Sequence, residues 1–267
     1  MSGINGIGGG NQYNYNLYNT QKDHDKHSRN VSSAKKLNQA SDGAAEMAIA
    51  KKLANAAKGM SVGRENLQSG RSALYIADGG MDGVNDYLQR MRELSIRSQN
   101  PFMSDSDKQA MQDEVSQLTQ GIDEAAAQTK YNEQPLLDED GSVSIVANGD
   151  GSSVEVTQGA LTAQGLGVQN YSLLENFDLD KIDAAMEKVS STRAMTGAQT
   201  NSIDHSMNYN AIAEENLTSS QSKLEDADIA EEMMALGTNK TLTAAQIMMQ
   251  KRQEEDEQQK TQQFFAQ

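Results

Sequence analysis

A large apolar residue recurs at every seventh position through the first third of the sequence, at Leu53, Met60, Leu67, Leu74, Met81 and Leu88. Three places after each comes a small or apolar residue, namely Ala56, Gly63, Gly70, Ala77, Val84 and Met91. Such a repeat, held over about six heptads, is typical of a long helix that packs against a partner helix along its whole length. At about 1.5 Å per residue, a helix over residues 51–97 would be about 70 Å long, which few compact domains need.

The same design returns near the other end of the chain. The seven-residue repeat there consists of Ile182, Val189, Thr196, Ile203, Asn210, Leu217 and Leu224. The residues three places further on are small or polar: Ala185, Thr192, Gln199, Ser206, Ala213, Ser220 and Ala227. We therefore expect one long C-terminal helix that lies against the first. Asn210 either fixes the register of this seam or faces solvent.

A third, shorter helix is predicted between these two. Spacings of four and three residues alternate through Met111, Val115, Leu118, Ile122, Ala125 and Thr129, which gives a period of about 3.5. Pro101 separates this helix from the first, and Ser104, Asp105 and Ser106 are candidate N-caps for it.

The predicted fold is mainly α: a long antiparallel coiled-coil or helical-bundle rod with a small β-hairpin insertion. Two long helices that are separated by a short helix and a hairpin can return antiparallel without a long crossover. The predicted bundle core consists of Leu53, Met60, Leu67, Leu74, Met81, Leu88, Val115, Leu118, Ile122, Val189, Ile203, Leu217 and Leu224.

The hairpin is predicted at about residues 136–168, where the period of the apolar residues changes to two. Val143 and Ile145 alternate with serines, and glycine-containing turn signals occur at 138–141 and 148–151. The first of these turns resembles the start of a calcium loop, but the later ligands of such a loop are missing. A turn is therefore the better interpretation, and no metal is expected.

Composition excludes several kinds of partner. The net charge of −15 argues against binding to nucleic acid or to an anionic membrane surface. An aromatic content of only 4 % favours thin helical seams over a thick globular core. No apolar run is long enough to predict a transmembrane helix, and the N-terminus lacks the features of a cleaved secretory signal. Because there is no cysteine, cysteine usage does not decide the redox compartment.

Both ends of the chain read as arms, because they cannot bury enough apolar area alone. We expect them to be disordered in the monomer and helical in an assembly. The predicted divisions are an N-terminal arm at 1–40, N-terminal rod helices with the hairpin at 41–180, a C-terminal rod helix at 181–240 and a C-terminal arm at 241–267.

No catalytic constellation is visible in the sequence. His24 and His27 lie in the N-terminal arm without metal-ligand spacing, and His205 stands alone beside the C-terminal seam. The glycine-rich segment at 6–10 lacks the lysine of a phosphate loop. We therefore expect neither an enzyme nor a cofactor.

Four segments carry a resemblance to one family. LNQASDGAAEMAIAKKLANAAKGM (37–60) and LQRMRELSIRSQN (88–100) resemble the amino-terminal conserved region of bacterial flagellins. The segment at 186–234, which contains AIAEENLTSSQSKLEDADIAEEMM, is similar to their carboxy-terminal region, and 148–168 resembles their hairpin. The chain passes from the hairpin almost directly into the last helix, so it looks like a short flagellin with only the inner helical domains.

The resemblance implies a secreted, extracellular structural subunit that polymerises with copies of itself into the flagellar filament for motility. It further implies unfolded passage through the flagellar type III export apparatus, an export chaperone that binds from about Ser219 onward, and hook-associated proteins as neighbours. One alternative is a hook–filament junction protein, which shares the terminal helices. A non-filament coiled-coil binding protein or enzyme is the other.

The family resemblance also implies a recognition site. In many flagellins a Toll-like innate immune receptor contacts the first rod helix at the motif that matches Gln89, Arg90, Glu93 and Leu94, together with a glutamate that matches Glu114. Arg90, Glu93 and Leu94 are three or four residues apart, so they share one face of a helix. The same surface is expected to pack against the next subunit in a filament.

Overall fold

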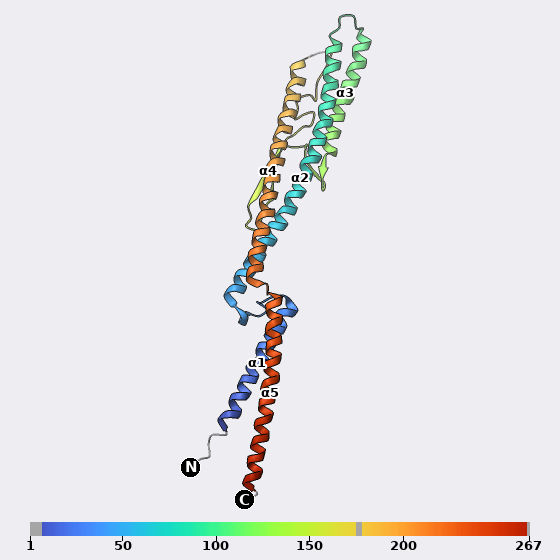
Figure 1. Cartoon of the computed structure of the whole chain (residues 1–267). Coiled ribbons are helices and arrows are strands. Elements are labelled where there is room, and N and C mark those ends of the chain that lie inside the picture. Colours follow the sequence, from blue (N-terminus) through green and yellow to red (C-terminus); the bar gives the residue numbers. More distant parts are fainter. Residues whose placement is uncertain (1–6, 175–177, 266–267) are drawn as a thin grey trace. The chain divides into compact units, whose positions relative to one another are not determined.

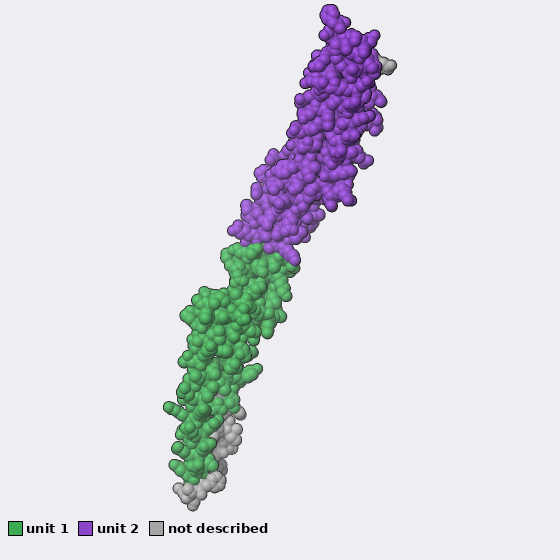
Figure 2. All heavy atoms as spheres, turned by 90° about the vertical axis from the view of Figure 1, so that its right-hand side faces the viewer, with its two compact units in different colours: residues 1–55, 217–267 green, residues 56–216 purple. Residues whose placement is uncertain are grey.

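Helices make up most of the chain in the computed structural model, which describes residues 7–174 and 178–265 (Figure 1). In chain order the α-helices of these residues are α1 (Ile7–Ser33), α2 (Ala44–Ser98), α3 (Asp105–Gln128), α4 (Leu179–Glu225) and α5 (Ile229–Phe265). A 3₁₀ turn, η1 (Ala40–Asp42), precedes α2. The chain divides into two compact units, one of residues 1–55 and 217–267 and the other of residues 56–216 (Figure 2).

In the unit of residues 56–216, α2 and α4 run antiparallel. Ion pairs along their length join Arg64 to Glu214 (3.2 Å), Arg71 to Asp204 (2.9 Å), Asp78 to Arg193 (2.9 Å) and Arg92 to Asp183 (2.7 Å). The partner's number falls along α4 as the number rises along α2, which defines the antiparallel register. The predicted antiparallel helical bundle is therefore confirmed for this unit.

The seams of the bundle are buried where three layers meet. Of the predicted core, the buried residues are Leu67, Leu74, Met81, Leu88, Val115, Ile122, Val189 and Ile203. The glycines of the seam bring other layers close to α2: a Cβ added to Gly70 would lie 2.1 Å from Cδ1 of Ile145 in the hairpin. Glycine at such a position allows the close approach that a side chain would prevent.

Five of the predicted core residues are only half-buried, which corrects the sequence prediction: Leu53, Met60, Leu118, Leu217 and Leu224. Leu118 packs against the edge of the buried cluster. Leu53 and Met60 lie at or before the start of the segment of α2 that the hairpin covers, where the Cα of Gly149 approaches Gly59, and Leu217 and Leu224 lie on the last part of α4. Without that third layer, apolar side chains of the seam keep part of their surface in solvent.

The α3 helix begins at a capping box that matches the predicted N-cap. The Ser104 hydroxyl accepts a hydrogen bond from the backbone N–H of Asp107, and the Asp107 carboxylate accepts one from the backbone N–H of Ser104, both at 3.2 Å. These bonds satisfy two backbone donors that a helix start otherwise leaves without partners. The Ser104 hydroxyl also donates to the Asp107 carboxylate at 2.7 Å, and this bond, followed by that from the backbone N–H of Ser104, lowers the pKa of the Asp107 carboxyl from its ordinary value.

The predicted hairpin is confirmed and consists of β3 (Gly141–Val146) and β4 (Ser153–Gln158). Val143 pairs with Val156, and Ile145 pairs with Val154. A second, smaller hairpin, which was not predicted, consists of β1 (Lys130–Tyr131) and β2 (Gln134–Pro135). Its turn holds Asn132 and Glu133 at positive φ (49° and 66°), a conformation that glutamate seldom adopts.

After β4 the chain crosses the bundle without regular structure and still buries apolar side chains. These are Leu161, Ala163, Leu166, Val168, Tyr171 and Leu173, which join the cluster formed by α2, α3 and α4. The Tyr171 hydroxyl donates to Ser95 Oγ at 3.0 Å, so its polar end also has a partner inside the cluster.

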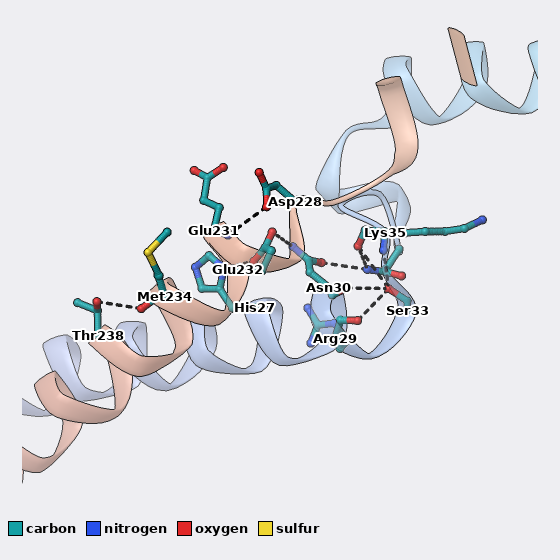
Figure 3. A network of polar contacts seen from close by, with 11 residues as sticks. His27, Arg29, Asn30, Ser33, Lys35, Asp228, Glu231, Glu232, Met234 and Thr238 are labelled. Atoms are coloured by element: carbon teal, nitrogen blue, oxygen red, sulfur yellow. Dashed lines mark hydrogen bonds and ion pairs between the residues drawn. The ribbon is translucent and has the colours of Figure 1, made fainter. Parts of the chain in front are cut away.

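In the unit of residues 1–55 and 217–267, α1 packs along α5. The Glu232 carboxylate accepts a hydrogen bond from Asn30 Nδ2 at 2.8 Å and forms a second contact with His27 Nδ1 (Figure 3). Further along the pair, Gln246 Nε2 donates to Thr20 Oγ1 at 3.1 Å. The described part of each arm thus has the helical form that we predict for an assembly. Disorder of the arms in the monomer stays a prediction.

The expectation of one long C-terminal helix is wrong, because α4 ends at Glu225 and α5 begins at Ile229. Backbone groups at the break pair with the segment after α1: Lys36 N donates to Glu225 O (2.8 Å), and Ala227 N donates to Ala34 O (3.0 Å). Asp228 Oδ1 then accepts from the backbone N–H groups of residues 230 and 231, which starts α5. The helix is therefore interrupted where its backbone pairs with residues 34–36, a long-range contact that no local sequence pattern indicates.

Candidate functional site

Four of the five residues predicted at the recognition site lie near the end of α2, and Glu114 lies on α3. Arg90 connects the two helices. Its Nε donates to Glu114 Oε1 at 2.7 Å, and one of its terminal nitrogens donates to Glu93 Oε2 at 3.0 Å. The structure therefore brings Arg90, Glu93 and Glu114 together, as the spacing indicated for Arg90 and Glu93 and the family resemblance implied for Glu114.

This cluster lies at the surface of the bundle. The Arg90 and Glu114 side chains are each 40 % exposed, the Glu93 side chain is 63 % exposed, and Gln89 is exposed as well. The hydrogen bonds to Glu114 and then to Glu93 raise the pKa of the Arg90 guanidinium, which stays charged in any case. One guanidinium thus faces two carboxylates and holds them in a fixed place for a polar partner.

Leu94 corrects the prediction, because it is not part of this surface. Its side chain is 1 % exposed and belongs to the buried cluster with Leu88 and Met91. Six residues after Leu88 and three after Met91, Leu94 returns to the inner face of α2. Its contribution to any recognition is to hold α2 in place, while Gln89, Arg90, Glu93 and Glu114 supply the accessible groups.

The arrangement suits binding between macromolecules. Arginine is enriched where protein surfaces recognise one another, and a guanidinium held by two carboxylates is oriented before a partner arrives. Among residues 7–174 and 178–265, no group of three or more histidine, aspartate or glutamate side chains could hold a metal ion. None of the helices described there combines the length and apolarity that crossing a bilayer requires.

A second surface, which sequence reasoning missed, lies on α5. Two methionine pairs are exposed there: Met233 (60 %) with Met234 (67 %), and Met248 (65 %) with Met249 (53 %). The pairs are separated by about four helical turns, so they lie on roughly the same side of α5. Methionine is flexible and adapts to irregular apolar surfaces, which suits an interface. The repeated Met-Met pair was the available signal.

Comparison with known proteins places the chain. The N-terminal helical region of bacterial flagellins matches residues 4–142, and their C-terminal helical region matches residues 179–263. The chain belongs to the bacterial flagellins. The resemblance seen in its sequence is thereby confirmed, and the match covers both sides of the bundle: α1 to α3 in the first region and α4 to α5 in the second.

Two relatives, at 31–32 % identity over most of the chain, agree with this assignment. A flagellin of Halalkalibacterium halodurans is 32 % identical over 228 residues, covering 82 % of this chain and 84 % of the relative. The flagellar filament 30.7 kDa core protein of Treponema maltophilum is 31 % identical over 241 residues, with the same coverage of 82 % and 84 %. Among solved structures, the crystal structure of Bacillus cereus flagellin is 25 % identical, with a TM-score of 0.48, and covers 55 % of this chain and 88 % of that one.

Flagellins are structural proteins, and the chain belongs to that family. The Arg90 cluster and the exposed methionines of α5 are then two candidate contact surfaces, one in each compact unit. The geometry of neither surface identifies its partner.

Proposed function

We propose that this protein is a structural subunit of the bacterial flagellar filament and assembles with copies of itself. The observation that carries the proposal is the match of both terminal helical regions of flagellins, in the family's order, to the helices of the antiparallel bundle. Relatives that are named filament core proteins favour the filament subunit over the hook–filament junction protein.

The exposed apolar side chains support self-association. Large apolar residues on α5 keep 36–67 % of their surface exposed in the single chain. A net charge of −15 opposes association of copies at low ionic strength, so apolar burial has to supply the driving force. Salt screens that repulsion, which is why addition of salt is a suitable trigger for assembly.

Electron microscopy of the purified protein, after addition of salt or short filament seeds, tests the proposal. Filaments of micrometre length support the filament subunit. A protein that stays monomeric under both triggers, while its helices remain folded by circular dichroism, contradicts the proposal and favours the junction protein.

The terminal arms are assigned to assembly in the same proposal. Deletion of residues 1–30 removes most of α1, and deletion of 245–267 removes the C-terminal part of α5. Either deletion leaves the unit of residues 56–216 intact in sequence. Both truncated chains should therefore keep a folded bundle and lose polymerisation. Normal filaments from both deletions would exclude the arms from the mechanism.

We propose a route and a place of action on the basis of the family assignment. We assign to the protein export through the flagellar apparatus, a chaperone on the segment from about Ser219 onward, contact with hook-associated proteins at the filament ends and an extracellular location. In addition, the surface formed by Gln89, Arg90, Glu93 and Glu114 is assigned to contact with a neighbouring subunit and, in the free monomer, with a Toll-like receptor. Binding of monomeric protein to the receptor ectodomain tests the last assignment.

A further inference from the structure

Phe102 is the most exposed large apolar residue of the described chain, with 94 % of its surface in solvent. It lies in the short loop between α2 and α3, and two backbone N–H groups of this loop donate to Asn100. The backbone N–H of Phe102 donates to Asn100 Oδ1 at 3.0 Å, and that of Met103 donates to Asn100 O at 3.1 Å. The ring is therefore presented on an ordered turn, where nothing in its own bundle covers it.

An apolar cavity of about 350 Å³ lies in the same unit, between α2, α4 and the two hairpins. Its inner wall includes Leu74, Met81, Leu137 and Val156. Its mouth includes Val143 and Val146, whose side chains are 39 % and 48 % exposed, so the cavity opens to solvent. The volume is at the low end of the range of about 300–1,000 Å³ in which proteins hold small ligands, which is enough room for a single aromatic ring.

The ring and the cavity of one copy cannot meet. Leu74 lines the cavity and Phe102 follows 28 positions later, with α2 continuous up to Ser98. At about 1.5 Å per residue, this separates the two by roughly 40 Å along the helix. Only a second copy can bring the ring of Phe102 to the cavity. A contact between two different surface sites of identical chains is heterologous, and when it repeats it generates an open polymer.

Charge favours a second copy as the occupant. The chain carries a net charge of −15, so most of its surface repels another copy. Both parts of the proposed contact are uncharged. The loop at 99–104 reads Gln-Asn-Pro-Phe-Met-Ser, and none of the residues that line the cavity is acidic or basic. The surfaces in direct contact carry no charge here, so the contact requires no desolvation of an ion.

We propose that Phe102 of one copy inserts into the cavity formed by Leu74, Val143, Val146 and Val156 of the next copy. This head-to-tail contact rests on the proposed filament function and specifies one of its interfaces. The favourable free energy of association comes from removal of the phenyl ring and the valine-lined mouth from water. Every copy in the polymer makes this contact in the same direction.

Photo-crosslinking locates the occupant of the cavity. Phe102→p-benzoylphenylalanine keeps an aromatic ring at the position, and filaments grown from an equal mixture of ¹⁴N- and ¹⁵N-labelled chains distinguish contacts between copies. Mixed-isotope peptides that join position 102 to residues 66–81 or 134–158 are expected. The same label at Tyr209, which is also exposed (63 %), is the control and should give no such enrichment.

Critical concentrations for assembly provide a second test. Phe102→Ser should raise the critical concentration on the order of tenfold to a hundredfold, because a buried phenyl ring is lost, while Phe102→Leu should change it only a few-fold. Ala73→Met, which fills the cavity from α2, should raise it similarly. The melting temperature of Phe102→Ser should equal that of the original chain, because the side chain touches nothing in its own copy.

The outcomes separate this proposal from the filament function. If the original chain forms no filaments, both fail. If filaments form but position 102 crosslinks elsewhere, or Phe102→Ser assembles normally, only the head-to-tail contact is wrong. Impaired assembly of Ala73→Met alone would mean that the cavity accepts another group, such as a small apolar molecule, and would overturn the role of Phe102.

Discussion

The side-chain amide of Asn210 donates a 2.6 Å hydrogen bond to the backbone carbonyl of Ala147. Asn210 is 1 % exposed, so the structure decides between the two alternatives for this seam residue in favour of a buried one. On the opposite side the same carbonyl faces Gly63, where an added Cβ would lie 1.7 Å from the oxygen. The end of β3 is thus wedged between α2 and α4. A buried amide that satisfies a backbone carbonyl fixes where the hairpin sits along the bundle.

Substitution Gly63→Ala should destabilise the bundle by about 1–3 kcal/mol, since the new methyl group overlaps a backbone carbonyl that cannot move alone. Gly79→Ala is the matched control on the same helix, because nothing lies within 4 Å of the added Cβ. Helix propensity alone should make that control more stable by up to about 1 kcal/mol. Urea unfolding followed by circular dichroism measures both free energies of unfolding. Equal stabilities would contradict the packing of the hairpin on Gly63.

Leu74→Asp should cost several kcal/mol, because Leu74 is 4 % exposed and packs in a cluster with Leu67 and Ile203. A carboxylate there has no partner and would be buried at the contact between α2, α4 and the hairpin. Tyr75→Asp introduces the same charge one residue later, at a side chain that is 58 % exposed, and should change little. An unchanged melting temperature for Leu74→Asp would argue against the bundle.

The seven-residue repeats identified the inner faces of α2 and α4 because each repeat depends only on the helix that carries it. Leu94 was misplaced because a family motif says which residues matter, while burial depends on the rotation of α2 in its bundle. The break between α4 and α5 could not be predicted, since its backbone groups pair with residues 34–36, almost two hundred positions earlier. The small β1–β2 turn could not be predicted because Glu133 adopts a positive φ there, and glutamate is not a residue that signals such a turn.

Acid should weaken the pairing of α1 with α5. Partial burial alone would raise the pKa of the Glu232 carboxyl, but hydrogen bonds from His27 and Asn30 lower it below its ordinary value of 4.5 (Figure 3). A carboxyl whose pKa is lower in the folded state contributes stability that is fully present above the unfolded pKa and is lost as pH falls through the folded pKa. The loss is therefore expected below pH 4.5. Hydrogen bonds from Gln221 and then from Lys35 also lower the pKa of the Glu225 carboxyl, so protonation of Glu225 should likewise reduce stability in acid.

Helicity measured by circular dichroism from pH 6 to pH 3 tests this expectation in the full chain. Glu232→Gln removes the titrating group, so the variant should be less helical at neutral pH and should lose less helicity on acidification. Glu231→Gln is the control, because it makes the same substitution at the preceding residue, which is exposed. If Glu232→Gln shows the same acid transition as the original chain, Glu232 is not the group responsible.

Arg90→Ala should weaken both filament assembly and binding of the monomer to a Toll-like receptor ectodomain, each on the order of tenfold. The substitution removes the guanidinium that orients Glu93 and Glu114 and leaves two like charges without a cation between them. Arg92→Ala is closely matched: its side chain is 41 % exposed against 40 % for Arg90, and it likewise pairs across the bundle, with Asp183 at 2.7 Å. Both variants should melt near the temperature of the original chain, because exposed ion pairs contribute little to folding.

Sedimentation of filaments and surface plasmon resonance with the ectodomain measure the two effects of Arg90→Ala. Equal losses in the two variants would assign them to general surface charge, and a monomer of the original chain without measurable affinity for the receptor would leave this surface to the contact between subunits alone.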